Sequence, residues 1–162
     1  MDFSIREYKE SDREVLKDCM ERLQDYIASV DPRKMVLRAE EFGEEYTKWL
    51  LSVMKEENGS IYLAERNGTI IGCVAGMLPS QAPHDIAGMV PYKYGRVQEL
   101  YVDEALRGAG VGKALLQKME EHFRANGCNV VYVEVFAPNT SAHEFYQSCG
   151  YADRDMNLMK KL

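Results

Sequence analysis

Hydrophobic and polar positions along this chain change period several times between alternation and a repeat of three to four residues. Alternating or short apolar segments predict strands over residues 3–8, 60–66, 69–78, 94–102, 129–135 and 155–161. Helical spacing predicts helices over 11–30, 39–56, 111–126 and 139–149, the first opened by a capping box at Ser11–Glu14. Asn67-Gly68 is typical of a type I′ hairpin turn, and residues 79–93 predict an irregular excursion. Strands and helices thus alternate around one mixed sheet, which predicts an α/β (α+β) fold.

Composition narrows the class of protein further. The chain has 162 residues, 46% of them hydrophobic and 28% charged, so we expect one globular domain over 1–162. No apolar run reaches membrane-spanning length and the first residues lack a signal-peptide layout, which favours a cytoplasmic protein without membrane contact. A net charge of −6 argues against nucleic-acid binding. The four cysteines are widely spaced and predict reduced, packed thiols with no metal site.

A glycine-rich segment joins the predicted strand 94–102 to the helix that follows it. Its residues are Arg107, Gly108, Ala109, Gly110, Val111, Gly112 and Lys113. Alternate glycines let backbone amides approach an anion closely, and a helix N-terminus adds unpaired N–H groups and a positive dipole end. The segment therefore predicts a pyrophosphate site.

Two commoner phosphate loops do not match this segment. A Walker A loop requires a hydroxyl residue after Gly-Lys, where this chain has Ala114, so an NTPase is disfavoured. A dinucleotide fingerprint requires Gly-x-Gly-x-x-Gly near the start of a βαβ unit, but here the third glycine falls one place early. The pyrophosphate must belong to another kind of ligand.

A second motif lies about thirty residues downstream, where the chain reads Asn-Thr-Ser-Ala-His-Glu-Phe-Tyr-Gln-Ser-Cys-Gly-Tyr over 139–151. Together with Arg-Gly-x-Gly-x-Gly upstream, it resembles the GNAT family of acyl-CoA-dependent N-acyltransferases. The resemblance is strong from about Val97 onward and rests on pattern alone before that. It implies a mostly antiparallel sheet with helices on both faces and a splayed central strand pair.

The resemblance also implies acetyl-CoA as cosubstrate, with its pantetheine arm lying in the splay beside a bulged strand. The backbone of Leu100, Tyr101 and Val102 would bind that arm, and an N–H there would polarise the acetyl carbonyl. Asn139 would contact it too, besides capping its own helix. Tyr146 matches the family's tyrosine that protonates or hydrogen-bonds the CoA sulfur.

Acyl transfer to an amine also requires a base that removes the amine proton. Many relatives carry a carboxylate where this chain has Glu99, and strand alternation directs that side chain away from Leu100 and Val102. Further candidates are Glu134, His84 and His143, of which His143 is expected to face solvent. Cys149 lacks a paired histidine and reads as a packing residue rather than a nucleophile.

The leading hypothesis is therefore direct acetyl transfer from acetyl-CoA to a primary amine, with a small-molecule amine favoured. Two alternatives stay open, a protein or peptide acceptor (N-terminus or lysine) and a non-catalytic CoA-binding regulatory domain. Dimers are frequent in families of this kind, so a homodimer is also open.

Overall fold

The computed structural model describes residues 2–81, 87–88 and 90–161, and its centre is one five-stranded sheet with the order β1-β2-β3-β4-β5. The strands are β1 (Ser4–Glu7), β2 (Ser60–Arg66), β3 (Thr69–Met77), β4 (Tyr94–Val102) and β5 (Val130–Val133). Neighbours from β1 to β4 pair antiparallel, and β4 pairs with β5 in parallel. The expected mixed, mostly antiparallel sheet is confirmed.

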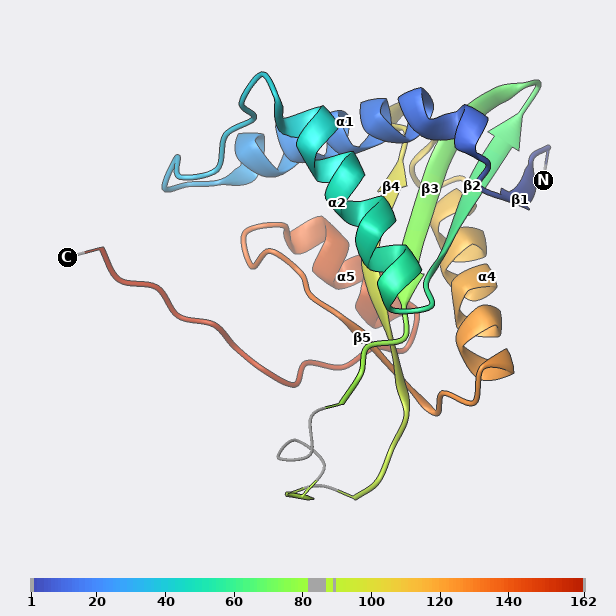
Figure 1. The fold of residues 1–162 in the computed structure, drawn as a ribbon. Coiled ribbons are helices and arrows are strands. Elements are labelled where there is room, and N and C mark those ends of the chain that lie inside the picture. The colour runs from blue at the N-terminus through green and yellow to red at the C-terminus, as the bar shows by residue number, and fades with distance from the viewer. Residues whose placement is uncertain (1, 82–86, 89, 162) are drawn as a thin grey trace.

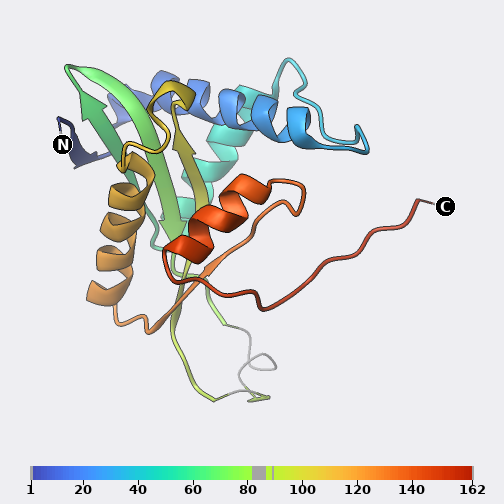
Figure 2. The same cartoon turned by 180° about the vertical axis from the view of Figure 1, so that it is seen from behind.

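Helices cover both faces of the sheet (Figures 1 and 2). On one face lie α1 (Arg13–Val30) and α2 (Phe42–Glu56), and on the other lie α4 (Val111–Ala125) and α5 (Thr140–Ser148). Two short 3-10 turns, Glu10–Asp12 and Glu104–Leu106, precede α1 and α4. Within the described residues no helix is long and apolar enough to cross a membrane.

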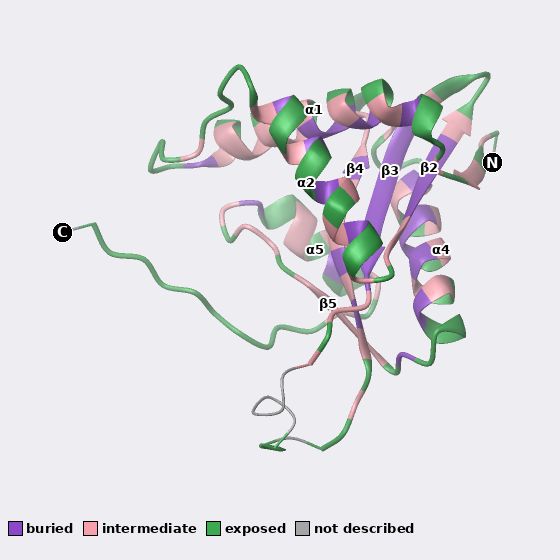
Figure 3. Ribbon diagram, viewed as in Figure 1, coloured by how far each residue is buried: buried purple, intermediate pink, exposed green. Residues whose placement is uncertain are grey.

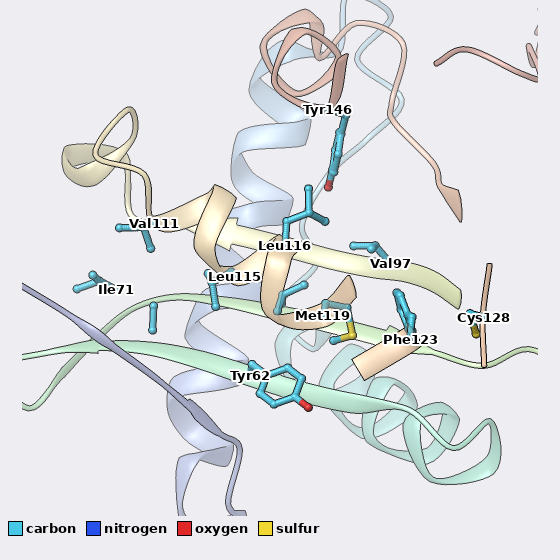
Figure 4. Close-up of a cluster of buried hydrophobic side chains, with 12 residues drawn as sticks. Tyr62, Ile71, Val97, Val111, Leu115, Leu116, Met119, Phe123, Cys128 and Tyr146 are labelled. Carbon is cyan, nitrogen blue, oxygen red and sulfur yellow. The ribbon is translucent and has the colours of Figure 1, made fainter. Parts of the chain in front are cut away.

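The apolar periodicity of the helices builds two separate cores. Leu115, Met119 and Phe123 of α4 are almost fully buried and meet one face of the sheet (Figure 4). Leu16 of α1 and Leu50 of α2 are likewise buried against the opposite face. Strands β2 and β3 are consequently mostly buried, as Figure 3 shows, whereas most residues of β4 and β5 are of intermediate burial.

The hairpin prediction at Asn67-Gly68 is correct. Asn67 has φ 51° and Gly68 has φ 77°, the left-handed conformations that a type I′ turn requires at both central positions. This turn sets the register in which Arg66 lies opposite Thr69.

The central strands β4 and β5 separate after a short pairing, which is the feature that creates the site. Their ladder runs only from Tyr94↔Val130 to Val97↔Val133, while β4 continues to Val102. On its other side, β4 has a bulge, because Glu99 lies opposite Ala75 and Val97 opposite Gly76, with Gln98 as the extra residue. The expected splay and bulge are therefore present.

Two local predictions are wrong. The capping box at Ser11–Glu14 does not form, because Ser11 lies inside the 3-10 turn and α1 begins only at Arg13. The Asp12 carboxylate instead accepts a hydrogen bond from the Lys9 backbone N–H. This hydrogen bond gives the Lys9 N–H a partner just before the helix. Asp12 therefore takes the place in which Ser11 was expected to act as the cap.

The strand expected at 155–161 is absent. After Tyr151 the chain runs away from the sheet toward the C-terminus (Figure 1), so its backbone has no neighbouring strand to pair with. Met156 and Leu158, the apolar residues that gave the alternation, are 83% and 89% exposed. Alternation predicts a strand only where one face can be buried, and this segment has no such face. The excursion at 79–93 lies partly outside the described residues.

Candidate active site

A cavity of about 280 Å³ opens where β4 and β5 separate. Helix α1, the start of α2, strand β4, the chain after β5 and helix α5 all contribute to its wall. Its lining includes Glu99, Leu100, Asn139 and Tyr146, four of the residues selected from sequence. The fold thus brings together residues that lie up to 47 positions apart, from 99 to 146.

Glu99 faces the layer of α1 and α2, as strand alternation predicts. Its strand neighbours Leu100 and Val102 pack instead against the core on the α4 side. The Glu99 carboxylate accepts hydrogen bonds from the Tyr46 hydroxyl and from the Gln98 amide, the latter at 3.4 Å. Burial raises the pKa of Glu99 above its usual value, and these hydrogen bonds counteract part of that effect. A carboxyl with a raised pKa beside a cavity is a candidate general base.

The bulge at Gln98 determines which side chains accompany Glu99. In a regular strand, residues three apart point to opposite faces, but one extra residue returns Arg96 to the face of Glu99. Arg96 also lines the cavity, and its Nη2 lies 2.8 Å from Glu134 Oε2 across the splay. Arg96 lies near enough for its charge to lower the pKa of Glu99, an effect smaller than the burial.

Tyr146 reaches the cavity from α5, on the opposite side of the splay from α2. Its side chain is buried at 8% exposure and forms edge contacts with the rings of Phe145 and Tyr151. Burial, followed by the charge of Glu99, raises the pKa of Tyr146 far above its usual value. The hydroxyl therefore keeps its proton at neutral pH and can donate to an atom in the cavity.

Asn139 caps α5, as its motif predicts. Its side-chain oxygen accepts from the Ala142 backbone N–H at 3.2 Å and from the Ser141 hydroxyl at 3.1 Å. The residue is 8% exposed and lines the cavity. The cap fixes the first turn of the helix that carries Tyr146.

The glycine segment lies at the start of α4, outside the cavity lining. Gly108 and Gly110 adopt φ values of 78° and 85°, and Gly110 is the N-cap, with no side chain to satisfy the first turn. The first helical bond in the ladder is from Ala114 N–H to Gly110 oxygen, at 3.0 Å. The preceding amides of this turn have no helical partner and are free to bind an anion. The Arg107 and Lys113 side chains are exposed there, with the Arg107 guanidinium 4.6 Å from the centre of the Tyr26 ring.

These features fit a CoA ligand. The donor-rich α4 N-terminus suits a pyrophosphate, and the stretch of β4 beyond Val97 has no strand partner on the β5 side, where an extended arm could bind. Of the strand residues expected to contact that arm, Leu100 lines the cavity. The Tyr101 side chain is buried against α1 and α2, and the Val102 side chain packs in the core on the α4 side. Neither side chain lines the cavity, so these two residues can offer only backbone groups.

The lesser candidates have other environments. The His143 side chain is 42% exposed and lies 2.6 Å from Asp153, in keeping with its expected solvent-facing position. Glu134 is 76% exposed at its side chain and bound to Arg96. Cys149 is half-buried at the end of α5, and His84 lies outside the described residues. Across the described ranges 2–81, 87–88 and 90–161, no group of three metal-ligating side chains comes together.

Sequence reasoning missed Tyr46, Gln98 and Arg96. Tyr46 looks like one more apolar position of an amphipathic helix, and its contact with Glu99 spans 53 positions. Arg96 would be assigned to the wrong face without the bulge. No local signal identifies these residues, because each depends on how the elements are assembled.

The family comparison agrees with this geometry. The model of the acetyltransferase (GNAT) family matches residues 16–151. The chain belongs to the GNAT family. This family uses acetyl-CoA and acts on amine acceptors.

Curated relatives of this GNAT chain match over part of their length. An uncharacterised N-acetyltransferase of Methanocaldococcus jannaschii is 30% identical over 111 residues, which are 68% of this chain and 46% of that protein. An aminoalkylphosphonate N-acetyltransferase of Salmonella typhimurium is 30% identical over 100 residues, 62% of this chain and 61% of the relative. The chain thus spans about half the length of the first of these relatives.

Solved structures share the GNAT fold along the whole chain. A protein from Bacillus halodurans superimposes with a TM-score of 0.81 at 18% identity, covering 98% of this chain and 99% of the other. AAC(6′)-Iy, solved in complex with a bisubstrate analogue that contains CoA, gives a TM-score of 0.71 at 13% identity, with 99% and 97% covered. At these identities the likeness shows the fold alone.

Proposed function

We propose that this protein is an acetyl-CoA-dependent N-acetyltransferase that transfers the acetyl group directly to a primary amine of a small molecule. The observation that carries the proposal is the cavity in the splay, which Glu99 and Tyr146 line from opposite sides. Family membership supports the reaction class, and the Salmonella relative, named for an aminoalkylphosphonate, supports a small acceptor.

Acetyl-CoA supplies the acetyl group when bound, so that the acceptor nitrogen bonds to the acetyl carbon as the thioester C–S bond breaks. Glu99 takes the proton of the acceptor ammonium and thereby produces the neutral, nucleophilic amine. After the nitrogen bonds to the acetyl carbon, it loses its second proton to solvent as the amide forms. The Tyr146 hydroxyl donates to the departing sulfur and regains a proton from solvent, and Glu99 releases its proton to solvent. The raised pKa of each group suits its part, since Glu99 must bind a proton and Tyr146 must retain one until transfer.

The remaining residues would hold the cosubstrate. The segment from Arg107 to Lys113 would bind the pyrophosphate through the amides that open α4, at Val111, Gly112 and Lys113, with the Arg107 and Lys113 side chains adding charge attraction. The backbone of Leu100, Tyr101 and Val102, which has no strand partner on the β5 side of β4, would bind the pantetheine arm and polarise the acetyl carbonyl. Asn139 would contact the same arm from the start of α5.

The test is a transfer assay with a panel of small amines and a lysine-containing peptide, read by thiol release and by the mass of the product. We expect a mass gain of one acetyl group on a small amine, abolished or strongly reduced in Tyr146→Phe and Glu99→Gln. Preferred acetylation of the peptide would make the acceptor a protein. Acetyl-CoA binding by calorimetry without transfer to any acceptor would instead identify a non-catalytic binding domain.

A further inference from the structure

The wall of the cavity that faces Glu99 is built from α1 and α2, and it is mostly apolar. Its polar member on α1 is Gln24, whose amide donates to the Leu37 backbone oxygen at 2.8 Å. Leu23 and Ile27 lie four residues apart on α1, and Phe42 and Tyr46 lie four apart on α2, so each pair shares one helix face. The Phe42 and Tyr46 rings stack with centroids 5.0 Å apart and planes inclined by 15°. Leu23, Ile27 and Phe42 are only partly buried, because they border this open space rather than a filled core.

Charge on this side of the cavity is sparse and largely neutralised. Among the described residues that line the cavity, the carboxylates are Glu99 and Glu134, and the cation is Arg96. Glu134 is bound by Arg96 at 2.8 Å, whereas the hydrogen bonds of Glu99 come from the neutral Tyr46 and Gln98 groups. Glu99 is therefore the carboxylate available to an ammonium.

We propose that the acceptor is a monoamine carrying one apolar aryl or branched alkyl group. Its ammonium meets Glu99, and its apolar group lies on the wall formed by Leu23, Ile27 and Phe42. The inference rests on the proposed transferase function and names the substrate class of the same site.

Competing acceptor classes fit this wall poorly. A second ammonium of a diamine would lie against apolar carbon or beside Glu134, whose carboxylate is already paired with Arg96, and losing its hydration without a free counter-charge is costly. A peptide N-terminus would bring its own N–H and C=O groups against Leu23, Ile27 and Phe42, whose side chains offer no hydrogen bond. A neutral apolar group alone gains from leaving water there.

Kinetics with four acceptors tests the substrate class. The acceptors are 2-phenylethylamine, ethanolamine, 1,4-diaminobutane and a peptide with a free N-terminus and one lysine. We expect kcat/KM for 2-phenylethylamine to exceed that for each of the others by at least about tenfold, since apolar contacts in a pocket discriminate on this scale.

Two wall variants test the position of the apolar group. Phe42→Ala and Ile27→Ala should each lower kcat/KM for 2-phenylethylamine by about 10- to 100-fold, with little change for ethanolamine. This contrast separates wall contacts from damage to Glu99 through Tyr46, because a damaged base would slow both amines equally. Val15→Ala is the matched control on α1, since Val15 is 39% exposed and does not line the cavity.

The outcomes distinguish a wrong substrate class from a wrong transferase function. Faster transfer to 1,4-diaminobutane or the peptide overturns the monoamine assignment while the transferase function stands. Equal loss for 2-phenylethylamine and ethanolamine in both wall variants overturns the assignment of the wall. Failure of acetyl-CoA to bind in calorimetry overturns the proposed function itself.

Discussion

The hydrogen bond from the Tyr46 hydroxyl to the Glu99 carboxylate makes a quantitative prediction about pH. Tyr46→Phe removes that donor while keeping the ring that stacks on Phe42. A hydrogen bond to a charged group contributes about 1.5–3 kcal/mol, and one pKa unit corresponds to about 1.36 kcal/mol. Loss of the bond disfavours the carboxylate form, so the pKa of Glu99 rises further. The acidic limb of the kcat/KM profile should therefore move up by about one to two pH units.

The groups around Glu99 support this direction. Gln98 and Arg96 of β4 remain in the variant and still favour the carboxylate, while Cys73 of β3 and Tyr146 of α5 face it without a charge to offer. Tyr46 is thus the donor from α2 whose removal the remaining contacts do not replace.

The assay is kcat/KM against pH for one amine, from pH 5.5 to 9, repeated with a second amine of different pKa. A limb that belongs to the acceptor moves with the acceptor, whereas the limb of Glu99 moves only with the variant. At low pH we expect Tyr46→Phe to be about 10- to 100-fold slower than the parent, with the difference vanishing on the high-pH plateau. Tyr151→Phe is the matched control, because its hydroxyl also bonds a glutamate, Glu120, but outside the cavity.

Loss of activity by the same factor at every pH would refute the reasoning, since it would mark a structural role for the Tyr46 hydroxyl. An acidic limb that stays in place in Tyr46→Phe would likewise show that Glu99 is not the group that titrates.

Three other changes test the rest of the site. Gly110→Asp should weaken acetyl-CoA binding by at least about tenfold in calorimetry, because it places a negative charge beside the pyrophosphate. The control is Gly110→Asn, which also tolerates a φ of 85° and should weaken binding far less. Tyr146→Phe should lower turnover by about ten- to a thousand-fold with CoA affinity nearly unchanged, and full turnover would assign the proton to water. Glu99→Gln should raise the melting temperature at pH 7–8 by about 2–4 °C, because ionisation of a group whose pKa is raised in the fold costs stability as pH rises through that pKa. This gap should close below about pH 4, where Glu99 is protonated in both states.

The parts of the site that could be predicted from sequence are those encoded locally. Asn139 and Tyr146 lie seven residues apart on one capped helix, so one short motif sets both the cap and the side chain that reaches the cavity. Glu99 could be assigned to its face because Leu100 and Val102 mark the other face of the same strand. Each of these inferences needed only the period of one element.

The remaining features of the site depend on how elements that are distant in sequence pack together. The single extra residue at Gln98 reverses the side-chain alternation of β4, so that Arg96 lies on the same face as Glu99. Glutamine has no particular preference for a bulge, so the sequence does not predict this reversal. Tyr46 becomes a partner of Glu99 only because α2 packs over the β3–β4 pair. The absent strand at 155–161 is the converse case, because the apolar alternation is present but the segment has no neighbouring strand with which to pair.

The bulge at Gln98 connects the binding of the cosubstrate to the chemistry of the acceptor. It follows Val97, the residue at which β4 separates from β5, so beyond the bulge the backbone of β4 pairs with β3 alone and has no strand partner on the side of the cavity. The same extra residue turns Arg96 and Glu99 toward α2, where Tyr46 fixes the carboxylate and Glu134 neutralises the guanidinium. A deletion that regularised β4 would therefore remove both properties together. Such a deletion variant should lose CoA binding and, at the same time, the acidic limb of the kcat/KM profile.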